Sequence, residues 1–223
     1  MPTHLLALVP SLALILASGG LRTDRLSPEQ LHVWNKIVEI VMAEDGGGQP
    51  LHPTLRQLWD AVDTSRHVIH IEIPERKGPR SYIAGRFVIT KVDPDGEAHE
   101  GILILNLRAI DKASTGPGAT RGGGFIPFKG LGKDERYAEL LGHELAHAVW
   151  HLANTERARL AQRLQGELET EMERLLRVGV RGPDEGLQER VATLDRRARE
   201  VEEPAEAAEV AIWKELKAGR QVR

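Results

Sequence analysis

Three residues within a stretch of five have the side chains best suited to chemistry. They are His143, Glu144 and His147, in the run LLGHELAHAVW (140–150). On a helix, residues four apart lie on one face about one turn from each other, so both imidazoles can bind a single metal ion. Glu144 points about 100° around the helix from His143, beside such an ion rather than on it. Chance occurrence on an amphipathic helix is the alternative, but His and Glu are costly among so many apolar neighbours unless something binds them.

The pattern His-Glu-x-x-His at 143–147 resembles the zincin metallopeptidases. The resemblance implies one zinc ion per chain, bound by His143 and His147, and hydrolysis of peptide bonds in a peptide or protein substrate. Glu144 is then the general base, which takes a proton from the zinc-activated water and passes it to the leaving amine.

A catalytic zinc site needs a third protein ligand, and this chain has no cysteine to supply one. His151 lies about 12 Å along the helix axis from His143, too far to share one ion on a straight helix. The metzincin continuation, a glycine and a third histidine soon after the motif, is absent. A carboxylate from a later helix remains, which is the gluzincin arrangement. That resemblance implies Glu202 as the ligand with Glu206 behind a motif histidine, and a rival register has Glu206 as the ligand and Glu209 behind it.

The sequence offers several further residues that could border the site. A donor to the developing oxyanion is expected, and its candidates are Tyr137, His151 and His70. His67 lies just before the predicted strand 68–73 and His70 lies in it, where a partly exposed polar-face position is the ordinary explanation. The glycine-rich segment 114–132 is predicted to be a lid beside the cleft or a plain linker.

The elements that must position these residues follow from hydrophobic periodicity. The spacing predicts helices from 27 and over 53–63, and alternation predicts strands over 68–73, 82–89 and 101–107. Short turns favour an antiparallel meander. In zincins an edge strand beside the active-site helix binds the extended substrate, and we expect strand 102–107 to be that edge.

The C-terminal part of the chain is predicted to be helical. Two charged segments, 155–177 and 184–201, have apolar residues on one face and form a helical hairpin inserted over 155–200. Pro204 favours a new helix that begins near Glu203 and carries the third ligand, although an acidic helix start would also explain these glutamates. The predicted class is α+β, with N-terminal helices, a small antiparallel sheet beside the metal-binding helix, and this hairpin.

Composition limits the remaining choices. The chain has 223 residues and a formal net charge of -3, so a single domain over 21–223 is expected and nucleic acid is excluded as a partner on electrostatic grounds. Residues 5–17 are apolar and are followed by Ser-Gly-Gly, which is typical of a signal peptide over 1–20 and too short for a stable transmembrane span. Export to the periplasm or the medium follows. If the run is instead a buried helix or precedes the true start, the protein is cytoplasmic.

A second function remains open. A non-catalytic domain could retain zinc as a structural or sensing element and use the hairpin as a protein-interaction surface. Glu144 argues against this function, because a purely structural site does not need a general base. A helical scaffold in which the motif is accidental is the third alternative.

Overall fold

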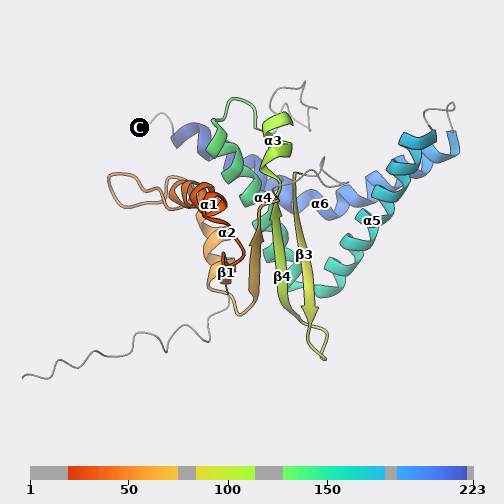
Figure 1. Cartoon of the computed structure of the whole chain (residues 1–223), viewed down its shortest axis with the longest axis horizontal. Coiled ribbons are helices and arrows are strands. Elements are labelled where there is room, and N and C mark those ends of the chain that lie inside the picture. Colours follow the sequence, from red (N-terminus) through yellow and green to blue (C-terminus); the bar gives the residue numbers. More distant parts are fainter. Residues whose placement is uncertain (1–19, 75–83, 114–127, 179–184, 220–223) are drawn as a thin grey trace, which may run out of the picture.

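The computed structural model describes residues 20–74, 84–113, 128–178 and 185–219. A small four-stranded sheet lies beside a group of helices, and a long helical hairpin extends away from them (Figure 1). The predicted α+β class, with N-terminal helices and a C-terminal hairpin, is confirmed. In chain order the elements are β1 (Gly20–Arg22), α1 (Pro28–Val41), α2 (Pro53–Asp63), β2 (Val68–Glu72), β3 (Gly85–Val92), β4 (Ala98–Leu105), α3 (Leu107–Ala113), α4 (Lys133–Ala153), α5 (Thr155–Val178) and α6 (Glu185–Gly219).

Helices α1 and α2 begin and pack as their sequences predict. The Ser27 hydroxyl accepts a hydrogen bond from the Gln30 backbone N–H at 3.4 Å, and the Gln30 side chain accepts one from the Ser27 N–H at 2.6 Å. This capping box satisfies two of the backbone donors that a helix start leaves open. Trp34 of α1 and Trp59 of α2 are buried with their ring centroids 5.7 Å apart. Both helices pack against α4, and neither contributes a residue to the cavity described below.

The sheet is mixed, so the predicted antiparallel meander is wrong. The strand order is β1-β2-β4-β3, in which β1, β2 and β4 run parallel and only the β3–β4 pair is antiparallel. Strand β4 is the most apolar of the four, and Leu103 and Leu105 on its inner face are fully buried. A strand this apolar buries most of its side-chain surface when it lies inside a sheet. Strand β3 carries Arg86 and Lys91, and such charged side chains are typical of an edge strand.

The expected substrate edge is also corrected. The strand predicted at 102–107 is β4, whose backbone is paired on both sides, by β2 and by β3. Within the described sheet, the edge strand beside α4 is β3. An extended peptide could therefore pair with β3 but not with β4.

Helix α4 is the centre of the fold. It packs against α1, α2, α6 and the sheet, and most of its length is buried. Gly142 makes the contact with α6 possible, because a Cβ there would lie 3.0 Å from Leu55 Cδ1 and closer still to Ile212 Cδ1. The residue before the histidine pair is thus small so that α6 can approach.

Helix α6 is one continuous helix, which differs from the expectation of a new helix near Glu203. Its N-terminal half pairs with α5 to form the hairpin, and its C-terminal half packs against α4 and α2. A proline inside a helix removes one backbone hydrogen bond. Packing at Leu187 on one side and at Ile212 and Leu216 on the other, all nearly fully buried, outweighs that loss.

The N-terminal prediction falls mostly outside the described residues. Residues 1–19 of the predicted signal peptide are not described, but Gly20 is the first residue of β1, and its N–H donates to the His67 carbonyl at 2.6 Å. Cleavage after Gly20 would remove this contact. Among the described residues, no helix has both the length and the apolar composition of a membrane span.

Candidate metal centre

The two motif histidines face each other on α4. Their Nε2 atoms are 3.1 Å apart, the ring centroids are 4.8 Å apart, and His147 is buried. Two nitrogens bound to one tetrahedral zinc at about 2.0–2.1 Å would lie about 3.3 Å from each other. The observed separation is close to that value, although a hydrogen bond between neutral rings has a similar length.

Glu144 occupies a space that a glycine leaves for it. The Glu144 side chain is buried and lies against Gly85, the first residue of β3. A Cβ at position 85 would come within 2.8 Å of the Glu144 Cγ and Cδ atoms. Glycine is therefore required at this point of the strand, and β3 fixes where the carboxylate can lie. An isolated glycine in a predicted strand is a known sign of close approach, so this residue could have been found from the sequence.

A carboxylate from α6 lies behind the first histidine. Glu209 is buried, and its Oε2 atom is 3.5 Å from Nδ1 of His143. Metal-binding histidines commonly direct the nitrogen that does not bind metal to such a carboxylate, which fixes the ring and its tautomer. The rival register named Glu209 for this role, and the structure brings it to His143.

A third buried carboxylate lies in the same region. Glu139, one turn before His143, is fully buried and accepts a hydrogen bond from the Phe128 N–H at 3.2 Å. Burial raises the pKa of Glu139 to about 8, and the negative charge of Glu209 adds to the rise. This residue has no counterpart in the sequence-based predictions, because nothing in its spacing separates it from a solvent-facing glutamate.

The third ligand must come from α6 if it is one of the predicted glutamates. Ile212 packs at Gly142 and Glu209 reaches His143, so α6 passes α4 in the opposite direction. Glu206 lies one turn before Glu209 and is thereby level with His147, whereas Glu202 is about 10 Å from Glu209 along the axis. The side chain of Glu202 lies outside the described part of the structure. Within the described residues, no three His, Asp or Glu side chains converge as a ready-made metal site.

The histidine pair and Glu144 open into a small cavity of about 80 Å³. Its walls come from β3, α4 and α5. The lining residues are Gly85, Arg86, Phe87, His143, Glu144, His147, His151, Ala161 and Gln162. The α5 residues were not predicted, because no sequence signal indicates which turn of a charged helix faces a site.

The predicted oxyanion donors are placed differently from one another. His151 is buried in the cavity wall, with its ring centroid 5.3 Å from that of His147. The Tyr137 hydroxyl donates to Asp111 at 2.9 Å, and burial together with that carboxylate raises the pKa of Tyr137. His70 lies between Asp24 and Glu100, at 3.4 and 3.5 Å. Only His151 lines the cavity among these three.

The other histidine and the predicted lid take no described part in the site. Burial lowers the pKa of His67, and His67 is not among the residues that line the cavity. The predicted lid lies outside the described residues over 114–127. Its last residues, 128–132, lead directly into α4.

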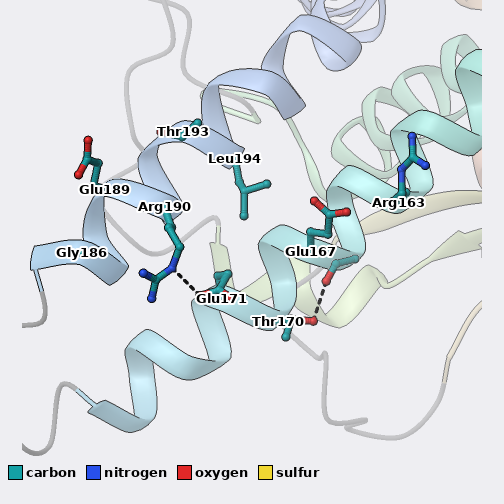
Figure 2. Close-up of a pocket in the computed structure, with 10 residues that line it drawn as sticks. Arg163, Glu167, Thr170, Glu171, Gly186, Glu189, Arg190, Thr193 and Leu194 are labelled. Carbon is teal, nitrogen blue, oxygen red and sulfur yellow. Dashed lines mark hydrogen bonds and ion pairs between the residues drawn. The ribbon is translucent and has the colours of Figure 1, made fainter.

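A larger hollow of about 940 Å³ lies on the hairpin, between α5 and α6. Figure 2 shows Arg190 of α6 directed towards Glu171 of α5, where the two side chains are 3.6 Å apart. Thr170 donates to the Gly166 carbonyl of its own helix at 2.8 Å. The described residues that line this hollow include charges of both signs, and they show no catalytic arrangement.

Comparisons with known proteins do not add to this geometry: no protein-family model, curated protein or solved structure matches the chain.

Proposed function

We propose that the protein is a zinc-dependent peptidase. The observation that carries the proposal is the meeting of the His143 and His147 Nε2 atoms at 3.1 Å, in one cavity with the buried Glu144 carboxylate. A pair of core histidines needs no acid beside it. A buried carboxylate is costly unless it has a partner or a role in chemistry, and this one lies where a general base of a metallopeptidase is needed.

The residues present fit a zinc ion. His143 and His147 would bind it through Nε2, Glu209 would hold the His143 ring from behind, and Glu206 is our choice of third ligand because it is level with His147. When bound, zinc supplies a Lewis acid that polarises the scissile carbonyl and acidifies water. Glu206 takes the place of Glu202, the first choice from sequence, in this assignment.

Residues of the chain then carry out proton transfer, substrate binding and stabilisation of the oxyanion. Glu144, held in place by Gly85, takes a proton from the attacking water and returns it to the leaving amine. The β3 edge, which borders the same cavity, receives the peptide backbone by main-chain hydrogen bonds. His151, in the wall, is the best placed of the predicted donors to the developing oxyanion.

Metal analysis tests this proposal. Purified wild type is compared by mass spectrometry with His147→Ala, Glu206→Ala, Glu202→Ala and Glu144→Gln. We expect about one zinc per chain in wild type, in Glu202→Ala and in Glu144→Gln, with loss in the other two. Glu144→Gln should also lose cleavage of labelled casein by about 10²–10⁴-fold while it keeps the metal. A wild type that takes up no zinc after reconstitution would overturn the proposal.

A non-catalytic zinc domain is the second candidate, and the size of the cavity favours it. About 80 Å³ does not admit a peptide. This candidate predicts that zinc binds, that Glu144→Gln changes nothing measurable, and that no variant cleaves casein.

A further inference from the structure

Helix α5 forms one wall of the cavity at the candidate site. Ala161 and Gln162 lie in the wall of the cavity that also contains Glu144 and the start of β3. The cavity is partly open to solvent and has a volume of about 80 Å³. A water molecule takes about 30 Å³, whereas pockets that bind ligands measure about 300–1,000 Å³. The observed conformation admits water to Glu144 and excludes a peptide.

The closed position of α5 is held by contacts outside the cavity. Asn154, in an extended conformation (φ -150°, ψ 87°), separates α4 from α5. The Thr155 hydroxyl accepts a hydrogen bond from the Ala98 N–H at 3.2 Å, and the Arg157 guanidinium lies 4.7 Å from the centroid of the Trp150 ring. Asn154 is the one non-helical residue between the two helices, and its side-chain oxygen caps α5 by accepting a hydrogen bond from the Arg157 N–H at 3.0 Å.

The closed position also leaves a polar group unsatisfied. The Gln162 Nε2 atom is inaccessible to solvent and has no hydrogen-bond partner among the described residues. A buried donor without an acceptor disfavours the state that buries it. Movement of α5 away from β3 would return this amide to water, so the closed state lacks one of the contacts that would make it permanent.

We propose that α5 is an autoinhibitory cover: the observed conformation is latent, and a peptide reaches Glu144 and the β3 edge only when α5 turns away at Asn154. This inference rests on the proposed peptidase function. It explains why the proposed general base and the β3 edge, which pairs with β4 alone among the described strands, lie beside a cavity too small for the substrate.

Tethering the cover is the direct test, and the chain suits it because it contains no cysteine. Arg86→Cys and Gln162→Cys place thiols on facing walls of the cavity, where a short bifunctional maleimide can join them. The zinc-loaded full chain is assayed on labelled casein before and after joining. We expect at least a tenfold loss on joining, with unchanged zinc content. Activity within twofold of the same protein before joining would overturn the cover.

A matched tether controls for the reagent. Glu171→Cys with Arg190→Cys joins α5 to α6 across the hairpin, where the native side chains meet at 3.6 Å, without tying α5 to β3. This pair should change casein cleavage less than twofold on joining. An equal loss with both tethers would show that stiffening the hairpin, rather than covering the site, is responsible, and would also overturn the cover.

Weakening a contact that holds α5 should raise the activity instead of lowering it, and a single substitution is enough for this test. Arg157→Ala removes the contact with Trp150 and should raise kcat/KM on casein about two- to fivefold. Arg174→Ala is the control, since its ion pair with Glu171 at 3.1 Å stays within α5. Equal rates in the two variants, with zinc bound in both, would contradict the cover alone. Absence of zinc from wild type would instead remove the peptidase itself, and the cover with it.

Discussion

The body around α4 and the hairpin of α5 and α6 bury their side chains to very different degrees. Along α4 most residues are buried, including Glu139, Glu144, His147 and His151, whereas the described part of α5 buries only Ala158 and Leu164. In the body, buried polar groups are held on several sides by separate elements. In the hairpin, α5 and α6 contact each other along one face, and their surface carries charges of both signs. The difference shows that the candidate site lies in the closely packed part of the molecule, whereas the outer hairpin is held mainly by the contact between its two helices.

The largest effect is expected from a substitution that tests how closely the side chains pack in the body around α4. Gly85→Ala places a methyl group where the Glu144 side chain lies, so the carboxylate must shift. A displacement of about 1 Å in a catalytic group can cost about 100-fold in rate, and we expect that loss in kcat on casein with zinc retained. Gly46→Ala is the control, because a Cβ there meets nothing within 4 Å. Full activity of Gly85→Ala would show that the pocket is looser than described.

The next effect concerns the support that α6 gives to the body. Glu209→Ala removes the carboxylate behind His143, and the affinity for zinc should fall about 10- to 100-fold. Competition with a zinc chelator measures it. Lys214→Ala, an exposed position on the same helix, should leave the affinity unchanged. Equal affinity in both variants would separate Glu209 from the metal centre.

A third test uses pH and the zinc-free protein. Because the pKa of Glu139 is raised to about 8 from an ordinary value of 4.5, the folded state binds a proton that the unfolded state releases. The resulting stability is complete below about pH 4.5 and is lost as the pH rises through 8. Glu139→Gln should flatten the dependence of the free energy of unfolding on pH across this interval, as urea titrations at several pH values would record. A variant with the same slope as wild type would place the titration elsewhere.

The smallest effect is expected on the hairpin. Arg190→Ala breaks the pair with Glu171, a partly exposed contact at 3.6 Å, and should change the free energy of unfolding by less than about 1 kcal/mol. Zinc affinity should be the same as in wild type. A large change in either quantity would mean that the hairpin and the body are coupled more closely than their packing indicates.

Sequence periodicity was sufficient for much of the fold and for the centre of the candidate site. The capping box at Ser27, the helix around His143 and the three strands near their predicted positions all depend on local patterns that the structure keeps. Strand order could not be obtained in this way, since alternation reveals that β4 is half buried but not which strand lies on each side of it. Continuity of α6 through Pro204 was missed for a related reason: the packing that overrides a proline comes from distant segments.

The outer parts of the site show the same limit. His143, Glu144 and His147 were found because their spacing along one helix is itself the geometry. Glu139 and Gln162 reach the site from separate turns and elements, so their roles depend on how α4, β3 and α5 meet. Choosing between Glu202 and Glu206 required the direction in which α6 crosses α4, which no local pattern contains.

The continuity of α6 has a mechanical consequence. Residues 185–209 form a rod about 36 Å long between the hairpin end and the carboxylate behind His143. A tilt of about 5° around the anchored end moves the far end by about 3 Å, whereas Glu209, near the fulcrum, barely shifts. A displacement of the tip is therefore reduced before it reaches the histidine, so a small tilt of the hairpin leaves the ring aligned.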